Sequence, residues 1–377
     1  MPPISDHDAG TYETGLAVAA VILLALGSAG CTGENSTGPT TPSRPAQYRV
    51  IDVALEGRDM RALVVDATDS AWACEHEGYP FRVETDGTAM EVKRTSDGQS
   101  LKAGGTTWDV ALDHLSRPVF GIWWRAAAIP QDPDALDAWM YCTGENYACL
   151  LRAQPYITAV SGEPDGSLLI GMAHSDGIVR LDPADPGAGC TSWNSDNTPM
   201  ALGTGNQTDG WIGGISSPLD GERWVGVRKD ALWRWRDGGT PWDPEDDEWT
   251  GFRESDTPLL TSNHFNHVTR GPDGRIWVGT ESGLVVIDGN TWVTVSDLPS
   301  PNVHRIDFDP DGFPWISTRK GVSVLSPTTL TMLWRWDAGK DLPNDGTWGS
   351  AFTSDGSTAF IATETGLAIL ERTAEAS

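Results

Sequence analysis

Three segments near the C-terminal end repeat one pattern, and this repeat constrains the fold more than any other feature of the chain. The segments are PDGRIWVGTESGLVVID (272–288), PDGFPWISTRKGVSVLS (310–326) and SDGSTAFIATETGLAIL (354–370). Each has an Asp-Gly turn, an apolar run, a Thr, and a Gly that precedes a second apolar run. Asp-Gly and Gly at these places favour tight turns between short antiparallel strands. The repeat therefore predicts a series of hairpins.

Weaker copies extend the repeat toward the N-terminus, at 219–235, 164–182, 116–124 and 67–74. Aligned copies place one aromatic or apolar residue roughly every 40 to 55 positions. These residues are Trp72, Phe120, Leu169, Trp224, Trp277, Trp315 and Ala359. Such a period, with about four short strands per unit, is typical of β-propeller blades.

The first strand-like segment, YRVIDVALEG (48–57), precedes the first copy and has no blade of its own. The last copy ends after its third strand, near Glu371. We expect the first segment to become the outer strand of the last blade, because this removes an open sheet edge. The predicted fold is all-β, a β-propeller of about seven four-stranded blades over residues 48–377, closed by the N-terminal strand.

One copy, residues 302–322, carries the repeat most fully. Its defining residues are Asn302, Val303, Ile306, Asp309, Gly312, Trp315, Ile316, Thr318, Gly321 and Val322. This pattern resembles the two-component regulator propeller repeat, which occurs in extracytoplasmic sensor domains of hybrid histidine kinases and in free-standing exported proteins. The resemblance is good over about 260–370 and thin over 155–235. It implies a propeller fold and a sensor-type binding role, and it specifies the fold better than the activity.

The N-terminal part of the chain resembles a bacterial lipoprotein signal. The apolar run at 16–26 would rise only about 16 Å as a helix, whereas the hydrocarbon of a bilayer is about 30 Å thick. Small residues at 27–30 then lead into Cys31, as in a lipobox. We expect 1–31 to be a signal peptide with Cys31 lipidated, and 32–47 to be a flexible polar linker. The resulting protein would be exported and lipid-anchored to the bacterial cell envelope, at the outer membrane or cell surface.

Four other cysteines suggest structural disulfides in an exported protein. Cys142 and Cys149 enclose a turn-like hexapeptide, so we expect a local bridge between them. The remaining pair would be Cys74 and Cys190. A zinc site is the alternative, but the chain has no Cys-x-x-Cys or paired histidine spacing to support it.

The formal net charge of −27, from 53 acidic and 26 basic residues, argues against nucleic acid as a partner. We expect a monomer that meets the membrane only through its lipid anchor. The acidic run 243–248 could hold calcium, but it lacks the spacing of an EF-hand loop and reads as a solvated surface loop. No cofactor is expected to be required, and calcium stays possible.

Propellers commonly bind ligands where loops enter the innermost strands. The repeat alignment predicts one residue from each blade at that position: Arg61, Asp109, Thr158, Gly213, Asn266, His304 and Trp348. Five of them can stack or form strong hydrogen bonds, namely Arg61, Asp109, Asn266, His304 and Trp348. We predict these five as the ligand-binding residues. The alternative is that they only satisfy loop backbone or face water in the channel.

Histidines near the same position raise the question of catalysis. His264 and His267 are three residues apart in a segment that reads as a loop entering a strand, which does not suit a helical metal site. His267 and His304 come from neighbouring blades and could approach one another. With Asp109 they are the candidates for acid-base chemistry in a propeller lyase or lactone hydrolase.

We weigh three functions for this chain. The favoured one is a non-catalytic module that binds a protein or glycan at its loop face, and the enzyme just described is the alternative. A sensory accessory protein that acts on a separate kinase is the third.

Three pairs of tryptophans have their own pattern: Trp123 and Trp124, Trp233 and Trp235, and Trp334 and Trp336. In the last two pairs the spacing of two residues puts both rings on one face of a strand. We expect packing between blades for at least two of the three pairs. An exposed aromatic platform for carbohydrate or protein is the alternative.

Overall fold

A computed structural model describes residues 45–92, 107–122, 126–130, 139–142, 156–173, 177–184, 189–203, 210–337, 340–343 and 346–373. The chain divides into two units, Met1–Thr41 and Pro42–Ser377, and the described residues all belong to the second. Cys31 and the predicted signal peptide lie outside the described residues, as does almost all of the predicted linker. No helix in the described ranges is both long and apolar enough to cross a membrane.

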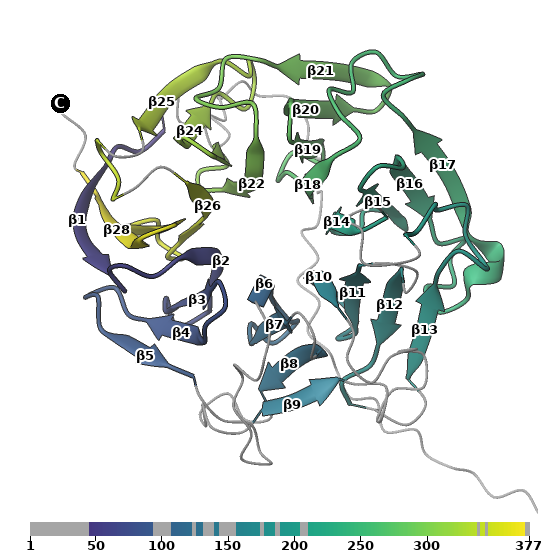
Figure 1. Cartoon of the computed structure of the whole chain (residues 1–377), viewed down its shortest axis with the longest axis horizontal. Helices are drawn as coiled ribbons and strands as arrows, with labels where there is room; N and C mark the ends of the chain where they lie inside the picture. The colour runs from purple at the N-terminus through teal and green to yellow at the C-terminus, as the bar shows by residue number, and fades with distance from the viewer. Residues whose placement is uncertain are drawn as a thin grey trace, which may run out of the picture. The chain divides into compact units, whose positions relative to one another are not determined.

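The described strands form seven antiparallel sheets of four strands each (Figure 1). Sheet 1 contains β2 (Met60–Val65), β3 (Ala71–Glu75), β4 (Pro80–Val83) and β5 (Ala89–Glu91). Sheet 2 contains β6 (Thr107–Leu112), β7 (Pro118–Ile122), β8 (Ala126–Pro130) and β9 (Trp139–Cys142). Sheet 3 contains β10 (Ile157–Gly162), β11 (Leu168–Met172), β12 (Ile178–Leu181) and β13 (Cys190–Trp193).

The remaining sheets continue the order around the axis. Sheet 4 contains β14 (Ile212–Ile215), β15 (Glu222–Val227), β16 (Leu232–Arg236) and β17 (Glu248–Phe252). Sheet 5 contains β18 (Phe265–Arg270), β19 (Ile276–Thr280), β20 (Gly283–Asp288) and β21 (Thr291–Val295). Sheet 6 contains β22 (Val303–Phe308), β23 (Pro314–Thr318), β24 (Gly321–Leu325) and β25 (Met332–Asp337). Sheet 7 contains β26 (Thr347–Phe352), β27 (Thr358–Thr363), β28 (Gly366–Arg372) and β1 (Tyr48–Ala54).

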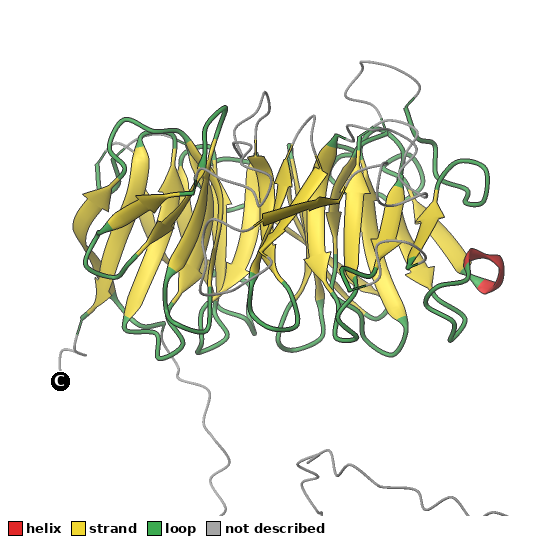
Figure 2. Cartoon of the chain, turned by 90° about the horizontal axis from the view of Figure 1, so that it is seen from below, coloured by secondary structure: helices red, strands yellow, loops and turns green. Residues whose placement is uncertain are grey.

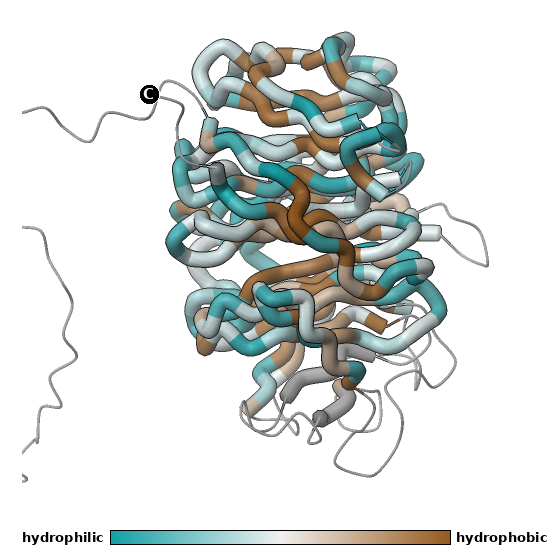
Figure 3. The backbone as a smooth tube through the Cα atoms, turned by 90° about the vertical axis from the view of Figure 1, so that its left-hand side faces the viewer, coloured by the Kyte–Doolittle hydropathy of each residue, from teal (hydrophilic) through white to brown (hydrophobic). Residues whose placement is uncertain are grey.

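The sheets are arranged radially, with β2, β6, β10, β14, β18, β22 and β26 nearest the axis (Figure 1). Seen from the side, the strands run between two layers of loops (Figure 2). This arrangement confirms the predicted all-β β-propeller fold. Hydrophobic residues concentrate along the middle of the strands and hydrophilic residues at the loops (Figure 3).

The last sheet is completed by the N-terminal strand, as predicted. β1 pairs antiparallel with β28, from Tyr48 opposite Arg372 to Ala54 opposite Leu367. The Tyr48 hydroxyl donates a hydrogen bond to the Gly356 carbonyl at 2.8 Å. Its ring also meets the edge of Trp315 in sheet 6, with ring centroids 5.4 Å apart. One residue of β1 therefore joins its own sheet to the neighbouring sheet.

The spacing between Asp and Trp within the repeat has a structural cause, because the Asp carboxylate bonds to both the turn and the Trp indole. Asp309 begins the turn after β22, and its carboxylate accepts from the Phe313 amide at 2.8 Å and from the Trp315 indole at 3.1 Å. In sheet 1, Asp66 accepts from the Trp72 indole at 2.7 Å in the same way. The Asp thus closes the turn and anchors a buried Trp from the next strand.

The tryptophan pairs separate by their place in the sheets. Trp233 and Trp235 on β16 are buried in the core, which confirms the packing role predicted for that pair. On the outer strand β25, Trp336 stacks on Trp315 at 4.7 Å, but Trp334 is 42% exposed. Only Trp336 of this pair therefore packs in the core, and Trp334 contacts it from outside with ring centroids 6.2 Å apart. Trp123 and Trp124 lie outside the described residues.

The predicted Cys74–Cys190 disulfide is wrong. Cys74 on β3 is a free, fully buried thiol that packs with Val110 and Phe120 between sheets 1 and 2. Cys190 begins β13 and packs against a different core cluster, between sheets 2 and 3. Two cysteines in separate clusters cannot meet the short Cα separation that a disulfide needs. The predicted Cys142–Cys149 bridge is also wrong, because Cys142 on β9 is a buried thiol that takes part in no disulfide.

The acidic run forms a short 3₁₀ turn, η2 (Pro244–Asp246), on the outside of sheet 4. Most of its carboxylates are exposed, as expected of a solvated loop. Asp247 differs, because its carboxylate accepts a hydrogen bond from the indole of Trp193 in sheet 3. The run therefore also ties two sheets together.

Replacing Tyr48 by Ala should lower the free energy of unfolding by about 3 kcal/mol, since it removes a buried ring at the junction of two sheets. Tyr48→Phe should cost about 1 kcal/mol, for the hydroxyl bond alone. Ile51→Ala on the same strand is the control, because Ile51 is 48% exposed. Denaturant unfolding measures all three. Equal losses for Tyr48→Ala and Ile51→Ala would show that β1 is not anchored in this way.

Candidate ligand-binding site at the mouth of the central channel

All seven innermost strands share one irregularity close to their first residue. In β22, Val303 pairs with Thr318 and Arg305 with Ser317, so His304 between them has no partner on β23. The other six strands show the same register shift. The seven residues at this position, named here the bulge ring, are Arg61, Trp108, Thr158, Gly213, Asn266, His304 and Trp348. A bulge redirects side chains from the ladder, and here it directs them to the channel.

One cavity of about 590 Å³ occupies this end of the channel, and every residue of the bulge ring lines it. The ligand-binding residues predicted from the repeat, Arg61, Asp109, Asn266, His304 and Trp348, all line it as well. The structure therefore brings these predicted residues together in one space. Their role in binding a ligand stays a prediction.

The alignment of sheet 2 was wrong by one residue. Val110 pairs with Phe120 as Ile306 pairs with Ile316, so Trp108 rather than Asp109 occupies the bulge position. Asp109 lines the same cavity from the next position along β6. Trp108 was missed because the degenerate copy in this sheet leaves the register open, and the pleat alone cannot locate a bulge.

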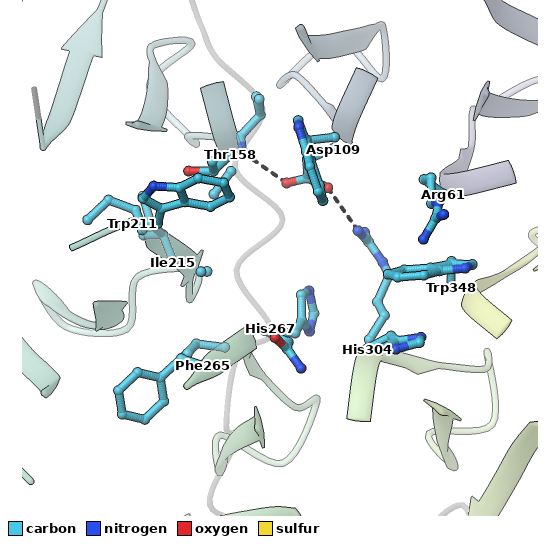
Figure 4. Close-up of a pocket in the computed structure, with 18 of the residues that line it drawn as sticks. Arg61, Asp109, Thr158, Trp211, Ile215, Phe265, His267, His304 and Trp348 are labelled. Atoms are coloured by element: carbon cyan, nitrogen blue, oxygen red, sulfur yellow. Dashed lines mark hydrogen bonds and ion pairs between the residues drawn. The ribbon is translucent and has the colours of Figure 1, made fainter. Parts of the chain in front are cut away.

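Trp348 forms one wall of the mouth between two other ring residues (Figure 4). The His304 imidazole stacks on it with centroids 3.9 Å apart and planes 8° apart. The Arg61 guanidinium carbon lies 3.8 Å from the centroid of the indole. Two groups so close to one centroid must take opposite faces of the ring. Arg61 also forms an ion pair with Asp59, which fixes the position of the guanidinium on the indole.

A second aromatic group lies on the other side of the mouth. Trp108 and Trp211, from sheets 2 and 4, meet edge to face with centroids 6.2 Å apart. Asn266 lies between the two aromatic groups along the ring, and its amide nitrogen donates to Asn302 and to the Val303 carbonyl, each at 2.9 Å. The mouth therefore combines flat apolar surfaces with a fixed amide.

The rim carries a further charged group on sheets 4 and 5. Glu281 accepts from Arg228 at 2.7 Å and pairs with His264 at 2.9 Å. His264 thus turns to the rim, whereas His267 lines the channel. The two histidines do not form a shared metal site, and no group of three His, Cys, Asp or Glu in the described part of the chain could hold a metal ion.

The next position along each innermost strand defines a second ring of seven residues, five of which line the cavity. It contains three large polar residues, Asp109, His267 and Arg305, and four small ones, Ala62, Ala159, Gly214 and Gly349. Arg305 reaches from β22 across the channel, and its Nη1 donates to Asp109 Oδ1 on β6 at 2.9 Å (Figure 4). Its Nε donates to Asp307 at 2.9 Å. An ion pair therefore joins opposite sides of the channel.

The same polar residues also tie neighbouring innermost strands together. Asp109 Oδ2 accepts from the Val160 amide at 2.9 Å, and Asp307 Oδ2 accepts from the Ser350 amide at 2.8 Å. His267 Nδ1 accepts from the Ile306 amide at 3.3 Å. Each bond satisfies a backbone N–H at the sheet boundary. The orientation of each side chain is consequently set by the strand beside it.

Burial and nearby cations hold both channel histidines in the neutral form. Burial lowers the pKa of His267 well below its ordinary value, and the charge of Arg305 lowers it further. Burial lowers the pKa of His304 to about 4, with Arg61 and Arg319 adding to the effect and the hydrogen bond to the Thr347 carbonyl opposing it. His267 accepts at Nδ1, so its proton is on Nε2.

The central charges have the pKa shifts expected of a buried triplet. Burial raises the pKa of Asp307, although Arg305 lowers it. Burial alone would lower the pKa of Arg305, but Asp307 and Asp109 raise it, so the guanidinium stays charged. His267 and His304 line the cavity from neighbouring strands, but they bond to different strands. Catalytic roles for His267, His304 and Asp109 stay predictions.

Arg305→Gln should lower the free energy of unfolding by about 3 kcal/mol at pH 7, because it leaves Asp109 and Asp307 without their cation. The loss should be smaller at pH 4. Without Arg305 the pKa of Asp307 in the folded protein rises further, and a raised folded pKa favours folding at low pH and loses that effect as pH rises.

The matched control is Arg335→Gln, which removes an exposed ion pair with Asp337 and should cost less than about 0.5 kcal/mol. Denaturant unfolding at both pH values measures the effect. A loss for Arg305→Gln that is the same at pH 4 and pH 7 would contradict the account.

The stability of the protein should fall between pH 6.5 and about 4 by more than that of a His304→Gln variant. The reason is that the unfolded chain binds a proton at His304 in this interval and the folded chain does not. Below about pH 4 the difference should stop growing. His114→Gln, which changes an exposed histidine, is the control for replacing a histidine as such. Parallel profiles for His304→Gln and the parent would exclude a buried neutral His304.

Comparison with known proteins supports the resemblance seen in the sequence. Residues 259–282 match the family model described as "Two component regulator propeller". No curated protein matches the sequence.

Solved structures share the fold at low sequence identity. The extracellular domain of the putative hybrid two component system BT3049 from B. thetaiotaomicron has 15% identity and a TM-score of 0.65, over 87% of this chain and 42% of that chain. Virginiamycin B lyase from Staphylococcus aureus has 12% identity and a TM-score of 0.64, over 87% of this chain and 99% of that chain. PorZ from Porphyromonas gingivalis has 16% identity and a TM-score of 0.60, over 81% and 45%.

This chain spans about two fifths of the length of the BT3049 extracellular domain that it matches. At these identities the likeness shows the fold alone. The repeat at 259–282 and the radial sheets agree with each other. The chain is therefore a β-propeller that carries the two-component regulator propeller repeat.

Proposed function

We propose that this chain is an exported, non-catalytic binding propeller that holds its ligand at the mouth of the central channel. The observation that carries the proposal is the bulge ring, in which all seven innermost strands contribute a side chain or backbone to one cavity of about 590 Å³. A cavity of this size, with flat aromatic walls and a few placed polar groups, has the character of a small-molecule or side-chain site.

The proposed architecture is a closed ring of seven blades, one for each four-stranded sheet. β1 supports closure, because it pairs with β28 and packs through Tyr48 on sheet 6. A closed ring leaves no wedge-shaped gap beside the channel, so a ligand can enter only from the faces that carry the loops.

Binding is favoured over catalysis by the bonds that the polar groups already make. Asp109 accepts from Arg305 and from Val160, and His267 Nδ1 accepts from a backbone amide. A general base needs a lone pair aimed at the substrate, and in Asp109 and His267 the acceptor atoms are engaged within the protein.

A lyase or lactone hydrolase is the second candidate. Two observations favour it: His304 is neutral in the channel, with its Nδ1 bonded to Thr347, and the fold resembles virginiamycin B lyase. A solved structure of that lyase contains a catalytically inactive histidine-to-alanine variant together with quinupristin. Turnover of any bound compound by this chain would favour the second candidate.

The setting that we propose is the bacterial cell envelope. Similar solved structures are extracellular domains of hybrid two component systems, and PorZ is described as a surface component of the type-IX secretion system. By extension, this chain would be a monomer anchored through a lipid on Cys31. It would bind a protein or glycan with no required cofactor, and it could serve a separate sensor kinase.

A binding screen of glycans, peptides and metabolites against the purified protein, with and without calcium, tests the function. For any compound that binds, Trp348→Ala and Asn266→Ala should each raise the Kd at least tenfold, since each removes part of the mouth. Trp334→Ala should leave the Kd unchanged, because this exposed Trp lies on the outer strand β25. Titration calorimetry gives the three values, and binding that is indifferent to Trp348 and Asn266 would place the site elsewhere.

A further inference from the structure

Arg305 has hydrogen-bond donors that its ion pairs do not use. Nε is bonded to Asp307 and Nη1 to Asp109, which leaves Nη2 without a partner among the described residues. The Arg305 side chain is 16% exposed, and Nη2 is not sealed within the protein. Arg305 lines the cavity, so Nη2 presents its two N–H groups to the space within it.

His267 adds a second donor beside Arg305 in the second ring. Its Nδ1 accepts from the Ile306 amide, so Nε2 carries the proton and has no partner in the described part of the chain. The burial of this imidazole and the charge of Arg305 keep it neutral. The middle of the channel therefore offers N–H donors from two strands, whereas its carboxylate acceptors are already bonded.

Resting on the function proposed above, we infer that Arg305 is the specificity-determining residue of the channel. Arg305 recognises an uncharged group that carries an acceptor oxygen, such as an amide or ester carbonyl. The flat face of the same ligand stacks on the tryptophans at the mouth. Arg305 Nη2 and His267 Nε2 donate to that oxygen.

The balance of charge excludes the obvious alternative, an anionic ligand. Arg305 already faces two carboxylates, Asp109 and Asp307, so the centre of the channel has no surplus positive charge. The other cations that line the cavity are also paired, Arg61 with Asp59 and Arg228 with Glu281. An anion would lose its hydration to enter a site that does not repay the loss. At the second ring a cation would face the N–H groups of Arg305 and His267, because the carboxylates of Asp109 and Asp307 are already bonded.

Gly349 gives Arg305 the room to cross the channel. A Cβ at Gly349 would lie 2.8 Å from Arg305 Cδ, which is closer than such atoms approach in proteins. Below the second ring the same cavity is lined by apolar residues, among them Val64, Ala111 and Ile215. The Arg305 side chain is therefore the polar group that a ligand meets after it has passed the tryptophans at the mouth.

Three probes of one shape test the inference on the full chain: benzamide, benzoate and benzamidinium. Benzamide should bind, and the other two should have a Kd at least tenfold higher, as measured by ligand-observed NMR titration. Arg305→Lys should weaken benzamide at least tenfold, because it keeps the charge and removes Nη2. Asp109→Asn should lower the Kd of benzoate relative to that of benzamide several-fold, because it removes one negative charge beside the Arg305 guanidinium.

Trp348→Ala separates this inference from the proposed function. If benzamide binding needs Trp348 but ignores Arg305→Lys, the channel site stands and the role of Arg305 is overturned. Preferential binding of benzoate, or no binding of benzamide, also overturns it. If Arg305→Lys does not fold, Gly349→Ala replaces it in the test. The added methyl group displaces the Arg305 side chain without removing a charge. That variant should weaken benzamide at least fivefold, and an unchanged Kd overturns the inference.

Discussion

The bulge near the start of every innermost strand is the constraint on which the site depends. A strand that kept its ladder would alternate its side chains strictly between the two neighbouring sheets. By leaving one residue unpaired, each strand directs that residue into the channel instead, as His304 does between Val303 and Arg305. Because the bulge recurs in all seven sheets, small differences in sequence at one position produce a wall of mixed chemistry around one cavity.

An ion pair across the channel joins two innermost strands that are far apart in the sequence, β6 and β22. Arg305 and Asp109 are on opposite innermost strands, and each also bonds within its own half of the ring through Asp307 or Val160. The pair therefore holds β6 and β22 together across the channel, while Tyr48 of β1 joins the last sheet to sheet 6. A buried pair of this kind contributes little net stability but penalises any arrangement that separates its partners.

Most of the fold could be predicted because its signals are local. The Asp309 carboxylate and the Trp315 indole are six residues apart, so a turn and a buried strand suffice to bring them together. The candidate site could be predicted only in part. Arg61, Asn266, His304 and Trp348 were located by the repeat, but Trp108 was missed because its sheet carries a degenerate copy. The Cys74–Cys190 bridge failed for a related reason, since pairing across sheets depends on which core cluster each thiol joins.

The sequence by itself determined the all-β repeat, the closing strand and the channel position in six of the seven sheets, because turns and strand periods act over a few residues. Only the tertiary structure decided that Arg305 crosses to Asp109, that Trp348 lies between His304 and Arg61, and that both channel histidines are neutral. These contacts join residues from different sheets. Their formation depends on which innermost strands face one another across the channel, and no local pattern encodes those distances.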